Sequence, residues 1–285
     1  MRLGMLSGLW WIAEGLSAVE SLDRMAALGF RTVDLHGVFH AGPRHLSARE
    51  RLAVGARLEH LGLEARNYVL HAPQNIPEAG ETQRRDNVAY LREGIDLAAS
   101  WGIRQLMLNA GRWVYGLPRE EAWRRSVGFL QEVCDYAAER GVWIAQETEP
   151  YVWFLVHDLA SARAMAADVD RSNFVHLLDL GHMALSREAE LDVMSVADDV
   201  IHAHLSDHEP MRHTNQVVGT GCLATADYLG WLRALEERGC LERFGYDELV
   251  VSFELGMPGD TITDADDRVR RSLEHVRGVA SFAGQ

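Results

Sequence analysis

Short apolar runs alternate along the chain with longer segments in which apolar residues recur at helical spacing. Each run is often followed by a charged residue or a histidine, which is typical of parallel strands that are buried on both faces. The runs predict eight strands, over residues 2–7, 32–36, 64–71, 105–109, 142–147, 174–179, 201–206 and 248–254. The segments between them predict helices over residues 17–28, 47–61, 82–101, 119–140, 159–167, 224–238 and 265–282.

Several predicted helices end at a glycine, as in Leu28-Gly29-Phe30 and Leu61-Gly62-Leu63. Glycine tolerates the left-handed conformation that closes a helix, and the apolar residue after it can begin the next strand. No linker rich in Pro or Ser divides the chain, and its 285 residues suit a barrel. The pattern therefore predicts one domain over residues 1–285, a single (β/α)8 TIM barrel, with an open doubly wound sheet as the alternative α/β architecture.

The composition excludes several functions. All 28 basic residues are Arg, so the chain has no lysine for a Schiff base, for anchoring pyridoxal phosphate or for a P-loop. A net charge of −14 repels DNA and RNA, and we expect no nucleic-acid partner. No apolar run approaches the roughly 20 residues of a membrane span, so no membrane association is expected. The three cysteines, Cys134, Cys222 and Cys240, lack CxxC spacing, which favours a reducing, cytoplasmic location.

Acidic residues and histidines stand at the ends of the later predicted strands. Glu147 ends the fifth strand, Asp179 the sixth and Glu254 the eighth, and the seventh carries His202 and His204. In a parallel barrel the carboxyl ends of the strands meet at one face. Three carboxylates and one imidazole there predict one divalent metal ion, with Mn as the first choice and Mg or Co as alternatives.

Five short motifs follow one another through the second half of the chain. They are Gly141-Val142-x-x-x-x-Glu147, Leu178-Asp179-x-Gly181-His182, His202-x-His204-x-x-Asp207, Gly219-x-Gly221 and Phe253-Glu254. In this order they resemble the xylose isomerase-like barrels, specifically the sugar isomerase and epimerase group that includes D-tagatose 3-epimerase. Weaker agreement covers Leu28-Gly29-Phe30-x-x-Val33-Asp34-Leu35 and His71-Ala72-Pro73 in the first half.

The resemblance implies a divalent-metal-dependent isomerase or epimerase that acts on a carbohydrate. It implies that Glu147, Asp179, His204 and Glu254 bind the metal, and that Glu147 and Glu254 transfer protons on opposite faces of the sugar. The proton is removed next to a metal-bound carbonyl, through an enediolate. By the same analogy we expect a homo-oligomer.

Further residues are predicted to contact the substrate. His182 matches the family's contact to a substrate oxygen, and His71 ends the third predicted strand. Glu149 is predicted to contact the substrate as well. It is also a rival of Glu147 for the metal, because it lies on the same side of an extended chain, and His202 is a rival of His204 in the same way. The remaining predicted contacts are Arg212, His213 and Trp113, and Asp34, His36 and Asn109 are left undecided.

The sequence also allows alternatives to an isomerase or epimerase. A lyase of the same superfamily, such as a dehydratase or a C-glycoside deglycosidase, would remove the same proton and then expel a β-substituent. A non-catalytic sugar-binding barrel is disfavoured, because both glutamates and both key histidines are present. The endonuclease IV branch would need an aspartate at Met211 and a histidine at Asn109, so a nuclease is not expected. Gly219-Thr220-Gly221 begins a GxGxxG/A pattern but follows a long polar loop, which argues against a dinucleotide site.

Overall fold

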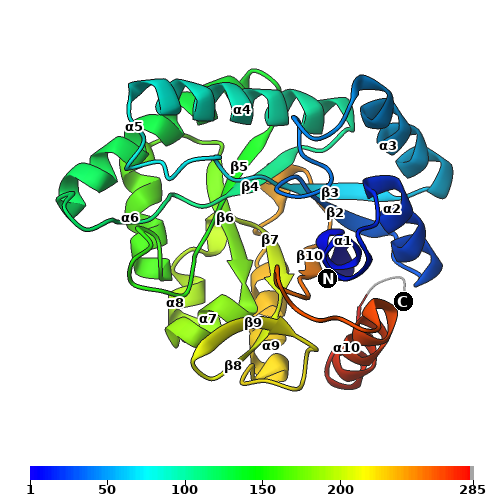
Figure 1. Cartoon of the computed structure of the whole chain (residues 1–285). Helices are drawn as coiled ribbons and strands as arrows, with labels where there is room; N and C mark the ends of the chain where they lie inside the picture. The colour runs from blue at the N-terminus through cyan, green and yellow to red at the C-terminus, as the bar shows by residue number, and fades with distance from the viewer. Residues whose placement is uncertain (283–285) are drawn as a thin grey trace.

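Eight parallel strands close into a barrel in the computed structural model, which describes residues 1–282 (Figure 1). Around the barrel the strands follow the order β1-β10-β7-β6-β5-β4-β3-β2. The first and last strands pair, Arg2 with Val250 and Met5 with Phe253, which closes the ring. The predicted TIM barrel is confirmed. Its strands are β1 (Arg2–Leu6), β2 (Thr32–His36), β3 (Glu64–Val69), β4 (Gln105–Leu108), β5 (Trp143–Glu147), β6 (Phe174–Asp179), β7 (Val200–Leu205) and β10 (Val250–Phe253).

Helices surround the strands (Figure 1). Those predicted from the sequence are α2 (Ala18–Ala27), α3 (Ala48–Leu61), α4 (Glu81–Ser100), α5 (Arg119–Ala138), α6 (Leu159–Val169), α9 (Thr225–Glu237) and α10 (Ala265–Val279). The structure adds α1 (Gly8–Glu14), α7 (Leu180–Ser186) and α8 (Glu190–Met194). It also adds an antiparallel hairpin after β7, made of β8 (Asp207–Glu209) and β9 (Arg212–Gln216), where the sequence predicted a polar loop.

Side chains next to the helix ends explain where the helices begin and end. Ser17 accepts a hydrogen bond from the backbone N–H of Glu20, whose side chain accepts from the N–H of Ser17 in return. Ser47 and Glu50 form the same reciprocal pair at the start of α3. Gly62 ends α3 with a φ of 61°, a left-handed conformation that glycine adopts without strain. Local sequence thus sets the ends of these helices.

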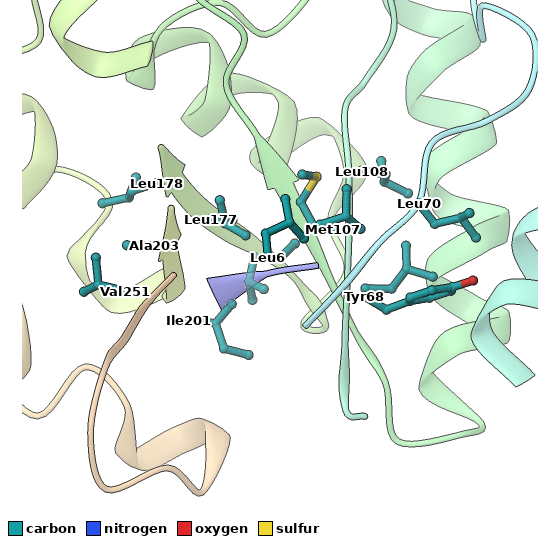
Figure 2. Close-up of a cluster of buried hydrophobic side chains, with 14 of the residues drawn as sticks. Leu6, Tyr68, Leu70, Met107, Leu108, Leu177, Leu178, Ile201, Ala203 and Val251 are labelled. Atoms are coloured by element: carbon teal, nitrogen blue, oxygen red, sulfur yellow. The ribbon is translucent and has the colours of Figure 1, made fainter. Parts of the chain in front are cut away.

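Buried apolar side chains pack on both faces of the strands, and Figure 2 shows a cluster of them from β1, β3, β4, β6, β7 and β10. Because side chains alternate along a strand, Leu177 and Asp179 of β6 share the inner face of the barrel, whereas Leu178 points outward to the helices. The apolar side chains on the outer face of the barrel pack between the strands and the surrounding helices.

The inner face is unusually polar. Branched aliphatic side chains dominate the interior of most TIM barrels. Here the barrel interior contains five fully buried polar side chains, those of Asp34, Asn67, His202, His204 and Ser252. Within residues 1–282, none of the helices has the length and apolar character that crossing a membrane requires.

Candidate metal centre and active site

Four side chains from neighbouring strands meet at the carboxyl end of the barrel. Glu147, Asp179, His204 and Glu254 each offer one ligand atom, and these atoms lie within 4.8 Å of one another. Glu147 and Asp179 are the last residues of β5 and β6, and Glu254 directly follows β10. Asp179 pairs with His204 in the β6–β7 register, which places them side by side. The structure therefore brings together the four residues that the sequence predicts as metal ligands.

The donor atoms of this cluster suit a divalent cation. The Nδ1 atom of His204 lies 3.1 Å from Glu147 Oε1 and 2.9 Å from Glu254 Oε2. Asp179 Oδ2 is buried and has no hydrogen-bond partner among the described residues, as expected of an oxygen reserved for another ligand. Three carboxylates and one imidazole are donors that Mn, Mg and Co accept. The residues present fit a metal ion.

The electrostatics of the cluster call for a positive charge at its centre. Burial raises the pKa of Glu147, and the neighbouring Glu254 carboxylate adds to that rise. Burial also disfavours a charged imidazole, but contacts with Asp34, Glu147 and Glu254 raise the pKa of His204 well above its ordinary value. Carboxylates this close repel each other unless a proton or a metal ion lies between them.

His182 stands beside the cluster because Asp179 also begins a helix. Asp179 Oδ1 accepts a hydrogen bond of 2.8 Å from the backbone N–H of His182 and so caps α7. The ring Nδ1–H of His182 donates to the carbonyl of Thr148 at 2.8 Å, and its Nε2 lies 2.9 Å from Nε2 of His213. Burial disfavours its charge, but Asp179, Glu147 and other nearby carboxylates raise the pKa of His182 to about 9. Thr148 and His213 thus fix the orientation of the His182 ring in the lining of the site.

Asp207 anchors the β8–β9 hairpin that carries His213. Its Oδ2 accepts hydrogen bonds from the backbone N–H groups of Gly219 (2.9 Å) and Gly221 (2.8 Å), and its Oδ1 accepts from Leu223 (3.0 Å). A Cβ atom added at Gly221 would lie 2.3 Å from Asp207 Oδ1. The Gly-x-Gly segment thus surrounds the protein's own carboxylate, and its amide groups are used for that purpose.

Asn215 is a site residue that the sequence analysis missed. Its side-chain amide donates to Glu254 Oε1 at 3.1 Å. Its backbone has a φ of 39°, and its N–H donates to Nδ1 of His208 while its carbonyl accepts from Gly256. Residues 212–216 are all polar, so no alternation in the sequence marks them as a strand that would place Asn215 on the same face as His213.

A cavity of about 250 Å³ opens beside the cluster. Pockets for drug-sized ligands measure roughly 300–1,000 Å³, so this one suits a small metabolite. Its polar side includes four of the predicted substrate contacts, namely His71, Glu149, His182 and His213. The rest of its lining is largely apolar and includes Leu9, Ile12, Val38, Phe39, Leu255, Met257 and Pro258.

Two predicted substrate contacts do not reach this cavity. Arg212 alternates with His213 along β9, so its side chain points to solvent, where it is 71% exposed and pairs with Glu209. Trp113 lies in the loop after β4, where its indole N–H donates to the carbonyl of Leu117. The structure does not bring these two residues to the cavity, and their contact with substrate stays a prediction.

The two rival ligands occupy other positions. Glu149 lines the cavity and accepts a hydrogen bond of 3.1 Å from the side-chain amide of Asn109. His202 lies deeper in the barrel, with its Nε2 2.8 Å from Asp34. Neither is part of the four-residue cluster, which contains Glu147 and His204 instead.

The fold and the cluster together define a class, TIM barrels with three carboxylates and one imidazole gathered at the carboxyl ends of their strands. The profile of the xylose isomerase-like TIM barrel family matches residues 22–279, and the chain belongs to this family. The resemblance found in the sequence is thereby confirmed.

Two of the proteins that this chain resembles carry the names of sugar epimerases. Fructoselysine 3-epimerase of Shigella flexneri is 22% identical over 183 residues, which are 64% of this chain and 65% of the relative. D-psicose 3-epimerase of Clostridium cellulolyticum H10, solved with D-tagatose, has a TM-score of 0.78 at 18% identity over 98% of this chain and 99% of that chain. The zinc-bound IOLI protein gives 0.78 at 17% identity over 99% and 100% of the two chains. At such identities the structural likeness establishes the shared fold.

Proposed function

We propose that this protein is a divalent-metal-dependent epimerase or isomerase of a carbonyl sugar, with Mn²⁺ as the preferred ion and Mg²⁺ or Co²⁺ as alternatives. The observation that carries the proposal is the position of Glu147 and Glu254. They reach the same cavity from β5 and β10, with β6 and β7 between them in the barrel wall. The epimerase activities in the names of the relatives support the same reaction class.

Two carboxylates on different sides of a sugar are the parts that this reaction needs. A bound divalent cation polarises a carbonyl oxygen and makes the neighbouring C–H more acidic. One glutamate accepts that proton, the electron pair of the broken C–H bond moves into the adjacent C–C bond, and the π pair of the carbonyl moves onto its oxygen. The other glutamate, in its acid form, returns a proton. Return to the opposite face of the same carbon gives an epimer, and return to the neighbouring carbon gives an isomer.

The cavity favours an uncharged substrate. Within the described residues 1–282, no arginine lines it, and the chain contains no lysine. A sugar phosphate would lack the cationic partners that phosphate groups usually find in proteins. We therefore propose an unphosphorylated ketose or oxidised glycoside, with His182 donating a hydrogen bond to one of its oxygens.

Replacement of each glutamate tests the proposal. With Mn²⁺ bound and a panel of ketoses and oxidised glycosides as substrates, NMR should identify an epimer or isomer as the product. Glu147→Gln and Glu254→Gln should each lower kcat far more than they raise KM, because a proton-transferring group acts mainly in the transition state. Near-normal kcat in either variant would contradict its assigned part.

A lyase is the second candidate, and the apolar wall of the cavity favours it. Leu9, Phe39 and Met257 could accommodate an aglycone that leaves after proton removal, with His71 or His213 supplying the proton to the departing group. An unsaturated ketone in the same NMR assay, together with a released aglycone or water, would establish this alternative.

A further inference from the structure

Asp34 is a buried carboxylate directly below the metal cluster. It lies on the inner face of β2, and both it and the two histidines beside it, His202 and His204, are fully buried. Its Oδ2 lies 2.8 Å from Nε2 of His202 and 3.4 Å from Nε2 of His204. Its Oδ1 has no hydrogen-bond partner among the described residues. A buried anion in a barrel interior needs a physical reason.

The two ring nitrogens of His204 face different neighbours. Nδ1 points at the carboxylates of Glu147 and Glu254, and Nε2 points at Asp34. A neutral imidazole that binds a cation through Nδ1 carries its proton on Nε2. Asp34 is the carboxylate that faces this nitrogen, so it favours the ring tautomer and the ring orientation that leave Nδ1 free.

Asn67 shares this environment. Its side-chain amide nitrogen is placed 3.5 Å from Nε2 of His204, and its Oδ1 has no partner among residues 1–282. Nitrogen and oxygen of such an amide are assigned from hydrogen bonding. If the amide is turned over, Oδ1 becomes a second acceptor for the same Nε2–H, which agrees with a proton at that nitrogen.

We propose that Asp34 is a positioning residue of the metal site, which acts through His204 and sets the affinity for the ion. The inference rests on the proposed metal dependence and deepens it. His202 donates to the same Oδ2 at the shorter distance and so fixes the Asp34 side chain. The alternative is that Asp34 serves only to satisfy His202 in the barrel interior.

Metal titration separates these two possibilities. Wild-type protein, Asp34→Asn and His202→Asn are titrated with Mn²⁺, and free Mn²⁺ is measured by electron paramagnetic resonance. Loss of a carboxylate that orients a metal-binding histidine should weaken Mn²⁺ binding by about 10- to 100-fold in Asp34→Asn. His202→Asn should change the Kd much less. His176→Asn, which alters another buried imidazole on the outer face of β6, is the matched control and should bind Mn²⁺ as the wild type does.

Two further measurements keep the result interpretable. The absorption spectrum of the Co²⁺-loaded protein should change in Asp34→Asn and stay unchanged in His176→Asn, since it reports ligand geometry. Thermal melting without metal checks that the variants fold. If Asp34→Asn does not fold, Asp34→Ala is used in its place. Wild-type affinity in the Asp34 variant, or an equal loss in His202→Asn, would overturn the inference. Mn²⁺ binding without sugar turnover would refute the proposed function and leave the Asp34 inference intact.

Discussion

Asn215 determines how one oxygen of Glu254 is held. Its amide donates to Oε1, while Oε2 faces the metal cluster. A hydrogen bond to a charged group contributes about 1.5–3 kcal/mol, so we predict that Asn215→Gly lowers kcat/KM by about 10-fold or more. Glycine is the suitable replacement, because it tolerates the φ of 39° at this position. Asn215→Asp should be worse still, since it places a second carboxylate beside Glu254, and wild-type activity in that variant would contradict this role.

The free energy of unfolding should depend on pH through His176. Because this residue lies outside the active site, its contribution can be measured separately. Its ring contacts the side chain of Gln146 on the outer face of the barrel, and burial lowers its pKa to about 4. The unfolded chain takes up a proton near pH 6.5, whereas the folded one does so only near pH 4, so stability is lost as the pH falls through this range. The loss attributable to His176 is about 3 kcal/mol.

Urea unfolding of wild-type protein and His176→Gln across this pH range checks the assignment. The variant should lose less free energy of unfolding on acidification, by about 3 kcal/mol, because its side chain does not titrate. If the free energy of unfolding changed equally with pH in the two proteins, the loss of stability in acid would not come from His176.

At the level of elements, the β8–β9 hairpin depends on the close approach of the Gly219–Gly221 loop to Asp207. We predict that Gly221→Ala disrupts this hairpin, because the added methyl group would lie 2.3 Å from both Asp207 Oδ1 and the carbonyl of His208. Hydrogen exchange should increase over residues 207–223, and turnover should fall because His213 and Asn215 lose their positions. Gly230→Ala is the control. Gly230 lies on the exposed side of α9 and nothing lies within 4 Å of the new methyl group, so this change should be neutral or slightly stabilising.

The same elements mark what sequence patterns could and could not predict. The strand predicted over residues 174–179 coincides with β6, because a run buried on both faces leaves a continuous apolar signal. The hairpin gave no such signal, because its residues are polar and its register depends on Asp207, a tertiary contact. Helix α7 was missed for a similar reason, since it is only seven residues long and directly follows Asp179, a residue assigned to the metal site.

For the candidate site, the family motifs favoured Glu147 over Glu149 and His204 over His202. The structure places the favoured residues in the four-residue cluster, and their binding of a metal ion stays a prediction. The sequence could not separate Arg212 from His213, because the strand that gives them opposite faces was not predicted. Trp113 was assigned from its residue type alone, and its loop turns the indole toward Leu117. The positions of side chains at the ends of regular strands were therefore predictable, and the positions of side chains on irregular loops were not.

For the whole molecule, metal binding should raise the free energy of unfolding and the melting temperature. An ion that binds the folded state alone stabilises it by about 2.7 kcal/mol at 100 times its Kd. At roughly 2–4 °C per kcal/mol, we predict that saturating Mn²⁺ raises Tm by about 5 °C or more. Asp179→Asn should abolish the increase while still capping α7, because asparagine is also a good N-cap. An equal increase in both proteins would place the ion elsewhere.

The central claim is that this barrel moves a proton at the carbon next to a sugar carbonyl, with a metal ion bound by Glu147, Asp179, His204 and Glu254. Solvent exchange measures that step directly. Mn²⁺-loaded protein is incubated with carbonyl sugars in deuterated water, and the recovered sugars are analysed by NMR and mass spectrometry. The account predicts deuterium at the carbon adjacent to the carbonyl, dependent on the metal and greatly reduced in Glu147→Gln and Glu254→Gln. Absence of deuterium from every carbonyl sugar tested, with Mn²⁺ shown to be bound, would contradict it.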